Sequence, residues 1–217
     1  MQIVFDNTKL LQGCQSLWGF SAYLKEYKLL FDTGSNGRVL LKNMKKLGVD
    51  VKEIEYVFIT HSHWDHIGGL DSIIELNPNV TLFLPSSLSK HLIKDLESLV
   101  KKVVICTKKP MKLFDNLYTT GLLGSEIPEQ ALIIDAEKAK VITGCGHFGI
   151  ENITQVAKDF LGKNIFWVEG GFHLLRSEDA KIRETIGKLK EMGVESAHAT
   201  HCTGEKAIEI FTQEFKL

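Results

Sequence analysis

One short segment constrains this chain more than any other feature. The segment Thr60–His66, which reads Thr-His-Ser-His-Trp-Asp-His, directly follows the apolar run Tyr56–Ile59, and that run predicts a buried strand. His61 and His63 stand two residues apart at the end of this strand, so their side chains project to the same side. Imidazole nitrogens are common ligands of Zn²⁺ and similar divalent ions. The two histidines are therefore expected to hold one metal ion together.

Two more potential ligands follow in the same segment. Asp65 and His66 lie where the chain turns into a helix, and from there they can reach a second metal ion. The alternative is a surface cluster of unrelated histidines. Four potential ligands within six residues, placed where a buried strand meets a helix, argue against that alternative.

Elsewhere the sequence repeats a strand followed by a helix. Strands are expected over 29–31, 56–59, 80–84, 103–105, 131–134, 141–142, 165–168 and 197–200. Helices are expected over 67–76, 86–100, 150–161, 177–192 and 205–215, with a further helical pattern after the turn at 32–34. This mixture predicts an α/β fold with a sheet-on-sheet core and helices outside. No linker or composition shift marks a boundary, so residues 1–217 are expected to form a single domain.

The charge balance and hydropathy bear on partners and location. Lys and Arg number 26 and Asp and Glu 27, and the net charge of −1 gives no general attraction to nucleic acid or to an anionic membrane surface. No apolar run approaches the ~20 residues that span a bilayer. The first residues lack the features of a signal peptide. We therefore expect a cytoplasmic protein that acts on a small molecule, and its oligomeric state stays open.

The cysteines are scattered. Cys14, Cys106, Cys145 and Cys202 form no C-x-x-C pair, which indicates free thiols rather than a disulfide framework. Cys145 and Cys202 stand close to histidines, which sets them apart from the other two.

Further motifs, read together with H-x-H-x-D-H, point to a known family. They are Phe31-Asp32-Thr33-Gly34, Gly68-Gly69-Leu70, Thr143-Gly144-Cys145-Gly146-His147, Gly170-Gly171-Phe172-His173-Leu174 and His201-Cys202-Thr203-Gly204. In these motifs the chain resembles the metallo-β-lactamase superfamily, and within it the branch similar to 7,8-dihydropterin-6-methyl-4-(β-D-ribofuranosyl)aminobenzene-5′-phosphate synthase. The resemblance spans most of the chain. It implies a four-layer αββα sandwich with the metal ions at one edge, between the two sheets.

The resemblance also implies ligands from the second half of the chain. The candidates are His147, brought inward by a glycine-flanked turn, and His201, whereas His198 is expected to be an ordinary strand residue. Cys145 stands where many family members carry an aspartate that bridges both ions, and it is a thiolate ligand, a bystander or neither. Asp32 is expected beneath the metal site, where a carboxylate can orient a ligand imidazole, with a local turn role as the alternative.

These features predict a metal-dependent hydrolase. Two divalent ions ~4 Å apart can lower the pKa of a water molecule towards neutrality and polarise the bond under attack. Asp65 is expected to ligate metal and orient the attacking hydroxide, and His173 to donate a proton to the leaving group. Zinc is the expected ion, with iron, manganese and nickel as alternatives. A transferase of the dihydropterin-synthase kind and a non-catalytic metal-binding sensor are the competing functions.

The expected helix starts indicate the class of substrate. Helices are predicted to begin at 66–67, after His147, and after 201–203 with Thr203 as the N-cap. Helix N-termini that follow ligand loops create positive potential, which suits an anionic and in particular a phosphorylated substrate.

Overall fold

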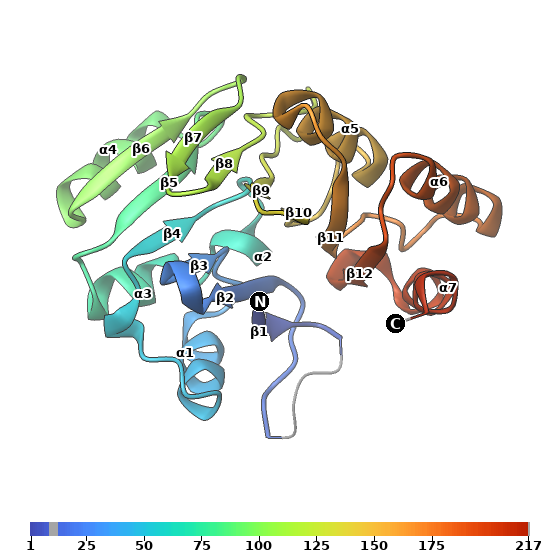
Figure 1. Cartoon of the computed structure of the whole chain (residues 1–217). Coiled ribbons are helices and arrows are strands. Elements are labelled where there is room, and N and C mark those ends of the chain that lie inside the picture. The colour runs from blue at the N-terminus through green and yellow to red at the C-terminus, as the bar shows by residue number, and fades with distance from the viewer. Residues whose placement is uncertain (9–12, 217) are drawn as a thin grey trace. The chain divides into compact units, whose positions relative to one another are not determined.

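The computed structural model describes residues 1–8 and 13–216. The chain forms two compact units, Met1–Cys106 and Thr107–Leu217, and each is built on one six-stranded sheet. In Figure 1 the first unit runs from blue to green and the second from green to red. None of the described helices combines the length and the apolar character that crossing a lipid bilayer requires.

The first unit has the strand order β1-β2-β3-β4-β5-β6. Its strands are β1 (Gln2–Asp6), β2 (Phe20–Leu24), β3 (Leu29–Phe31), β4 (Tyr56–Phe58), β5 (Thr81–Pro85) and β6 (Lys102–Cys106). Its helices are α1 (Gly37–Lys46), α2 (Trp64–Ile67), α3 (Leu70–Leu76) and α4 (Lys90–Leu99). Strands β1 to β3 pair antiparallel, and β3 to β6 pair parallel.

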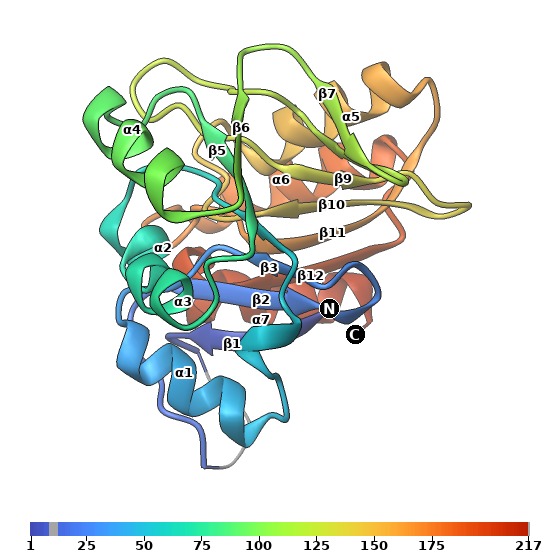
Figure 2. The same cartoon turned by 90° about the vertical axis from the view of Figure 1, so that its left-hand side faces the viewer.

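Strands β3, β4 and β5 are short, largely apolar runs because they lie inside the sheet, whereas the parallel strand β6 forms its edge. Helices α1, α3 and α4 cover one face of it (Figures 1 and 2), and Leu40, Ile73 and Leu96 from these helices pack with Leu30 and Leu82 in one buried cluster. Since β3 and β4 are parallel neighbours, the residues that follow them emerge at the same edge of the sheet. This places the turn after β3 beside the segment Thr60–His66.

The prediction of one continuous helix over 67–76 is wrong, both in where the helix begins and in that it is interrupted. The structure has a single turn, α2, which already contains His66, and then a separate helix α3. The break falls at Gly68 and Gly69, because the turn after β3 packs directly on them: a Cβ atom at Gly68 would lie 2.6 Å from the Ser35 carbonyl oxygen, and one at Gly69 would clash with the Thr33 carbonyl oxygen. The Gly68 N–H donates to the Gly34 carbonyl at 2.9 Å, which ties the two turns together.

The second unit has the strand order β12-β11-β10-β9-β8-β7. Its strands are β7 (Met111–Phe114), β8 (Leu117–Thr119), β9 (Leu132–Ile134), β10 (Ala139–Thr143), β11 (Ile165–Gly171) and β12 (Ser196–Thr200). Its helices are α5 (Ile150–Leu161), α6 (Asp179–Glu191) and α7 (Glu205–Phe215), with the 3₁₀ turn η3 (His201–Thr203) before α7. Strands β7 to β10 pair antiparallel, whereas β10, β11 and β12 are parallel neighbours.

The helices of the second unit follow the predicted pattern closely. Helices α5 and α7 match the predicted bounds, and α6 is shorter than the predicted range 177–192. Apolar residues of these helices and of the sheet form one buried cluster, to which Ile153, Ile186 and Phe211 contribute. The ends of β10, β11 and β12 lie at one edge of the sheet, so the loops that follow them are neighbours.

Two predicted details are wrong. The helix predicted over 86–100 begins only at Lys90 and ends at Leu99. The N-cap of α7 is Gly204 and not Thr203. The Thr203 hydroxyl instead donates to the Thr200 carbonyl at 2.6 Å and accepts the Phe172 N–H at 2.9 Å, so it joins η3 to the end of β11.

Candidate metal centre

The first unit gathers three histidines in the segment that follows β4. His61 and His66 are fully buried, and His63 is half-buried. The ring centroid of His61 lies 4.6 Å from that of His63 and 4.3 Å from that of His66. Asp65 is 5% exposed, and its Oδ2 lies 3.8 Å from His66 Nε2. All four predicted ligands of this segment therefore lie together within the unit.

A buried carboxylate fixes the orientation of two of these rings. Asp32 follows β3 and is fully buried. Its Oδ1 accepts the Thr60 N–H at 2.8 Å, and its Oδ2 accepts the Thr60 hydroxyl at 2.8 Å and the His66 Nδ1–H at 2.7 Å. Because the Thr60 hydroxyl donates to Asp32, its oxygen accepts from His61 Nδ1 at 2.8 Å.

This hydrogen-bond chain settles which ring nitrogens carry protons. His61 and His66 both hold their proton on Nδ1, so in each neutral ring the lone pair is on Nε2. A neutral imidazole whose Nδ1–H is bonded to a carboxylate or hydroxyl is the form that binds a metal through Nε2. The chemistry of the donor set in the first unit therefore fits a divalent ion.

The second unit gathers a different set of side chains. Cys145 and His147 follow β10, His173 follows β11, and His201 and Cys202 form η3 directly after β12. Cys145 Sγ lies 3.5 Å from His201 Nε2. The ring centroids of His147 and His173 are 4.3 Å apart. Three parallel strands thus bring five donor side chains to one sheet edge.

Two overlapping groups within this cluster have the spacing of metal ligands. Ligand atoms of Cys145, His147 and His173 all lie within 4.8 Å of one another, and so do those of Cys145, His201 and Cys202. Thiolate and imidazole together suit Zn²⁺ and related ions. The predicted candidates Cys145, His147, His173 and His201 are therefore neighbours within the second unit.

Glu129 is a site residue that sequence reasoning missed. Its carboxylate is buried, and it accepts the backbone N–H groups of Cys145, Gly146 and His147 at 2.8, 3.0 and 2.9 Å. These bonds hold the loop after β10 in one conformation. No motif surrounds Glu129 in the sequence, and its partners lie 16 to 18 residues away, so no local pattern could have indicated this role.

Backbone strain concentrates at the predicted site. Six described residues other than glycine have a positive φ, and three of them are Asp32 at 51°, His173 at 52° and His201 at 53°. Such conformations are uncommon outside glycine and often mark functional positions. Each of these residues directly or closely follows a parallel strand, and the left-handed conformation turns the chain sharply there.

The His173 and Cys202 side chains share a hydrogen bond. That contact raises the pKa of His173 above its ordinary value, although partial burial opposes the change. Burial acts to raise the pKa of the Cys202 thiol, but hydrogen bonds with Cys145 and His173 and the charge of His201 bring that pKa well below its ordinary value. The pKa of His173 is thus raised and that of Cys202 lowered, and the contact between the two side chains contributes to both shifts.

A hollow of about 310 Å³ opens beside two of these histidines. It is lined by His147, His173 and the loop 124–127. His173 and Glu126 are both exposed. A hollow of this size suits a small molecule.

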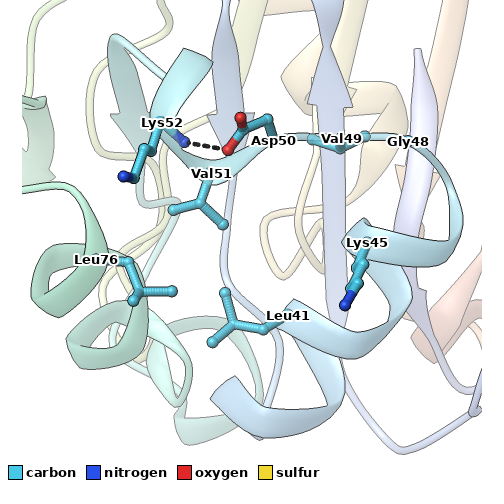
Figure 3. A pocket seen from close by; sticks show the side chains of 8 residues that line it. All are labelled: Leu41, Lys45, Gly48, Val49, Asp50, Val51, Lys52 and Leu76. Atoms are coloured by element: carbon cyan, nitrogen blue, oxygen red, sulfur yellow. Dashed lines mark hydrogen bonds between the residues drawn. The ribbon is translucent and has the colours of Figure 1, made fainter.

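Another hollow, of about 510 Å³, belongs to the first unit (Figure 3). It is lined by Leu41, Lys45, Gly48, Val49, Asp50, Val51, Lys52 and Leu76. The Asp50 carboxylate accepts the Lys52 N–H at 2.9 Å and is occupied in capping a 3₁₀ turn. The lining carries no histidine or cysteine, so we do not place the metal chemistry here.

The structure separates the remaining histidines from these clusters. His198 lies on β12, where its ring stacks on Trp167 at 5.1 Å and its Nε2 contacts the Ser196 hydroxyl at 3.1 Å. Burial, aided by the charge of Lys140, lowers the pKa of His198. His91 is exposed on α4. The expectation that His198 is an ordinary strand residue agrees with this environment.

Comparison with known proteins establishes the family. The family model described as the metallo-β-lactamase superfamily matches residues 14–124, and the chain belongs to this superfamily. A similar relative is the 7,8-dihydropterin-6-methyl-4-(β-D-ribofuranosyl)-aminobenzene-5′-phosphate synthase of Methanocaldococcus jannaschii. The two are 30% identical over 235 aligned positions, covering 87% of this chain and 80% of that protein.

Solved structures agree on the fold. The crystal structure of Tm1679, described as a metal-dependent hydrolase of the β-lactamase superfamily, matches with a TM-score of 0.80 and 29% identity, covering 99% of this chain and 92% of that one. The metallo-β-lactamase fold protein YhfI from Bacillus subtilis matches with a TM-score of 0.67 at 16% identity, covering 99% and 91% of the two chains. The predicted α/β class and metallo-β-lactamase fold are confirmed. The prediction of one domain over residues 1–217 stays a prediction.

Proposed function

We propose that this chain is a divalent-metal-dependent hydrolase that acts on a small anionic substrate. One observation carries the proposal: Asp32 and the Thr60 hydroxyl oxygen accept hydrogen bonds from His66 and His61 and so hold the protons of these two rings on Nδ1. This arrangement leaves the Nε2 lone pairs for a metal ion. Membership of a metal-dependent enzyme superfamily supports the same conclusion.

The proposed ligands of two divalent ions are the predicted ones. They are the three histidines and Asp65 of the segment 61–66, together with His147 and His201 of the second unit, and Cys145 is a further candidate. A bound divalent ion would supply Lewis-acid activation of a water molecule, with zinc as the expected ion. Asp65 carries a second carboxylate oxygen, which can accept a hydrogen bond from the attacking water and orient it.

His173 is proposed as the general acid. It faces the hollow of about 310 Å³, and its raised pKa keeps the imidazole protonated to a higher pH than usual. A protonated Nε2–H or Nδ1–H at this position can pass its proton to the leaving group as the bond breaks. The same positive charge favours a substrate that carries an anionic group.

Two features of the second unit favour an anionic substrate. Helix α2 is a single turn that contains His66, so its N-terminus no longer counts as a binding feature. Helix α5, which begins three residues after His147, and the charge of His173 carry the expectation instead. A phosphorylated small molecule remains the proposed substrate class.

A transferase of the dihydropterin-synthase kind is the second candidate. The 30% identity to the Methanocaldococcus jannaschii synthase over 87% of this chain favours it. The two candidates require the same ligands and differ in the group that accepts the transferred fragment: water in hydrolysis, and a second substrate in transfer. A non-catalytic metal sensor is less consistent with an accessible hollow beside His147 and His173.

The proposal is tested by metal removal and a substrate panel. The purified protein is stripped with a chelator, reloaded separately with Zn²⁺, Fe²⁺, Mn²⁺ and Ni²⁺, and assayed on phosphodiester, lactone, thioester and dihydropterin substrates. Hydrolysis that disappears on stripping and returns on reloading is expected, with phosphorylated substrates preferred over their phosphate-free analogues. Full hydrolysis by the stripped protein would refute metal dependence. Equal turnover of both substrate forms would refute the anionic preference.

A further inference from the structure

The proposed function gives Cys202 no role, and Cys202 lies outside the motif H-x-H-x-D-H. It lies in η3 next to His201 and is 5% exposed. Its Sγ contacts the Cys145 carbonyl oxygen at 3.4 Å, so its side chain is directed towards the loop after β10. The ligand atoms of Cys145, His201 and Cys202 lie within 4.8 Å of one another. The second unit thus holds two thiols and one imidazole in a single buried group.

The spacing of this group matches tetrahedral metal coordination. Zinc binds sulfur at about 2.3 Å and nitrogen at about 2.0–2.1 Å, which puts neighbouring sulfur and nitrogen ligands about 3.6 Å apart. The separation between Cys145 Sγ and His201 Nε2 is 3.5 Å. With Cys202 as a third donor within 4.8 Å, the group can supply three of the four ligands of a tetrahedral site.

The surrounding backbone leaves room for the second thiol. Gly171 ends β11, and a Cβ atom at that position would lie 2.8 Å from Cys202 Sγ and 3.2 Å from the Cys145 Cα. Any other residue would push the thiol away from Cys145. Glu129 fixes the loop that carries Cys145, and the positive φ of His201 turns the imidazole and the following cysteine back towards it. Gly171, Glu129 and the backbone conformation of His201 therefore each restrict the position of these side chains.

We propose that Cys202 is a metal ligand together with Cys145 and His201, which gives this metalloenzyme a thiolate-rich position selective for thiophilic ions. The inference rests on the proposed function, since it concerns one of the proposed metal ions. Two thiolates favour Zn²⁺, Fe²⁺ or Co²⁺ over Mn²⁺ and Mg²⁺, which prefer oxygen ligands. The sequence left manganese open as an alternative to zinc. Two thiolate ligands disfavour manganese at this position.

Cobalt substitution tests the proposal through a readout independent of turnover. The full-length protein is stripped of metal and reloaded with Co²⁺, and the near-ultraviolet thiolate-to-cobalt charge-transfer absorption is recorded. We expect Cys202→Ser and Cys145→Ser each to lose about half of this absorption, and the double variant to lose all of it, because each thiolate contributes separately. Cys106→Ser, which removes a buried cysteine of the first unit, is the matched control and should leave the absorption unchanged.

X-ray absorption of the zinc-loaded wild-type protein gives a second measurement that needs no variant. Two sulfur scatterers per chain at about 2.3 Å are expected. One sulfur per chain, or an unchanged cobalt absorption in folded Cys202→Ser, would overturn the assignment of Cys202 while leaving metal-dependent hydrolysis intact. Failure of the wild-type protein to bind zinc or cobalt at all would instead overturn the proposed function.

Discussion

The His66 Nδ1–H donates to the Asp32 carboxylate at 2.7 Å, and neither side chain is exposed to solvent. The two residues are 34 positions apart in the sequence, and they meet because they follow neighbouring parallel strands. This contact fixes both the tautomer and the direction of the imidazole. It makes Asp32 a positioning residue for the histidines of the first unit.

Replacement of Asp32 is expected to weaken metal binding. In Asp32→Asn an amide replaces the carboxylate that accepts from both Thr60 and His66, so one of these bonds is lost and His66 is free to change tautomer. Zinc affinity, measured by competition with a chelating dye, should fall by about 10- to 100-fold. Asp50→Asn, which alters an exposed carboxylate of the same unit, should bind zinc as the wild type does. Equal affinities of all three proteins would contradict the role of Asp32.

Replacement of Glu129 is expected to destabilise the second unit. Glu129→Gln removes the charge that three backbone N–H groups share, and a buried bond to a charged group contributes about 1.5–3 kcal/mol. We expect a loss of about 3 kcal/mol in the free energy of unfolding in urea. Glu126→Gln changes an exposed residue nearby and should leave stability unchanged. A difference below about 0.5 kcal/mol between the two variants would rule out the anchoring role.

His173 is expected to affect turnover more than metal content. In His173→Gln the side chain keeps a similar size but loses the transferable proton, so kcat should fall by about 10²- to 10⁴-fold. Zinc content should stay at the wild-type level, which separates a proton donor from an essential ligand. His198→Gln removes a histidine held against Trp167 and is expected to retain full kcat. A large loss of zinc in His173→Gln would reassign this residue as a ligand.

Glu169 is expected to make stability depend on pH. Burial raises its pKa above the ordinary value of 4.5, with Lys140 acting in the opposite direction. The contribution of this group to stability is therefore fully present below pH 4.5 and is lost as the pH rises through the pKa of the folded state. Glu169→Gln should equal the wild type near pH 4 and be more stable at neutral pH. Glu137→Gln, at an exposed position, should show no such divergence in urea unfolding.

The glycine pair between α2 and α3 is expected to be essential for packing. Gly69→Ala puts a Cβ atom against the Thr33 carbonyl oxygen, and the resulting overpacking should cost about 1–3 kcal/mol of unfolding free energy. In the helix α6, Gly187 has open space around it, so Gly187→Ala should stabilise the protein by about 0.5–1 kcal/mol. Thermal unfolding should show a lower Tm for Gly69→Ala and a higher Tm for Gly187→Ala than for the wild type. A Gly69→Ala variant as stable as the wild type would contradict it.

Local sequence patterns predicted much of the fold. Helices α5 and α7 were predictable to the residue because an apolar face recurs at helical spacing between clear boundaries. The segment Thr60–His66 was predictable because it follows a short apolar strand. The break between α2 and α3 was not, since it depends on a turn more than 30 residues earlier in the chain that packs against Gly68 and Gly69.

The candidate site shows the same division. Histidines and cysteines could be nominated from their chemistry and spacing, and Asp32 from a family resemblance. Glu129 and the orientation of Cys202 could not. Glu129 contacts the loop after β10 from the segment before β9, Cys202 contacts the same loop from η3, and both contacts exist only in the folded unit. Thr203 has the composition of an N-cap, but its hydroxyl is used between η3 and β11.

The zinc content of His63→Ala tests metal binding by the segment Thr60–His66 most directly. Zinc per chain and turnover are measured together for the wild type, for His63→Ala and for Ser62→Ala, which alters an exposed neighbour in the same loop. We predict that the wild type and Ser62→Ala bind two zinc ions per chain and turn over substrate. His63→Ala is expected to lose its bound zinc and also its activity. A His63→Ala variant that keeps two zinc ions and full turnover would contradict the proposed metal centre.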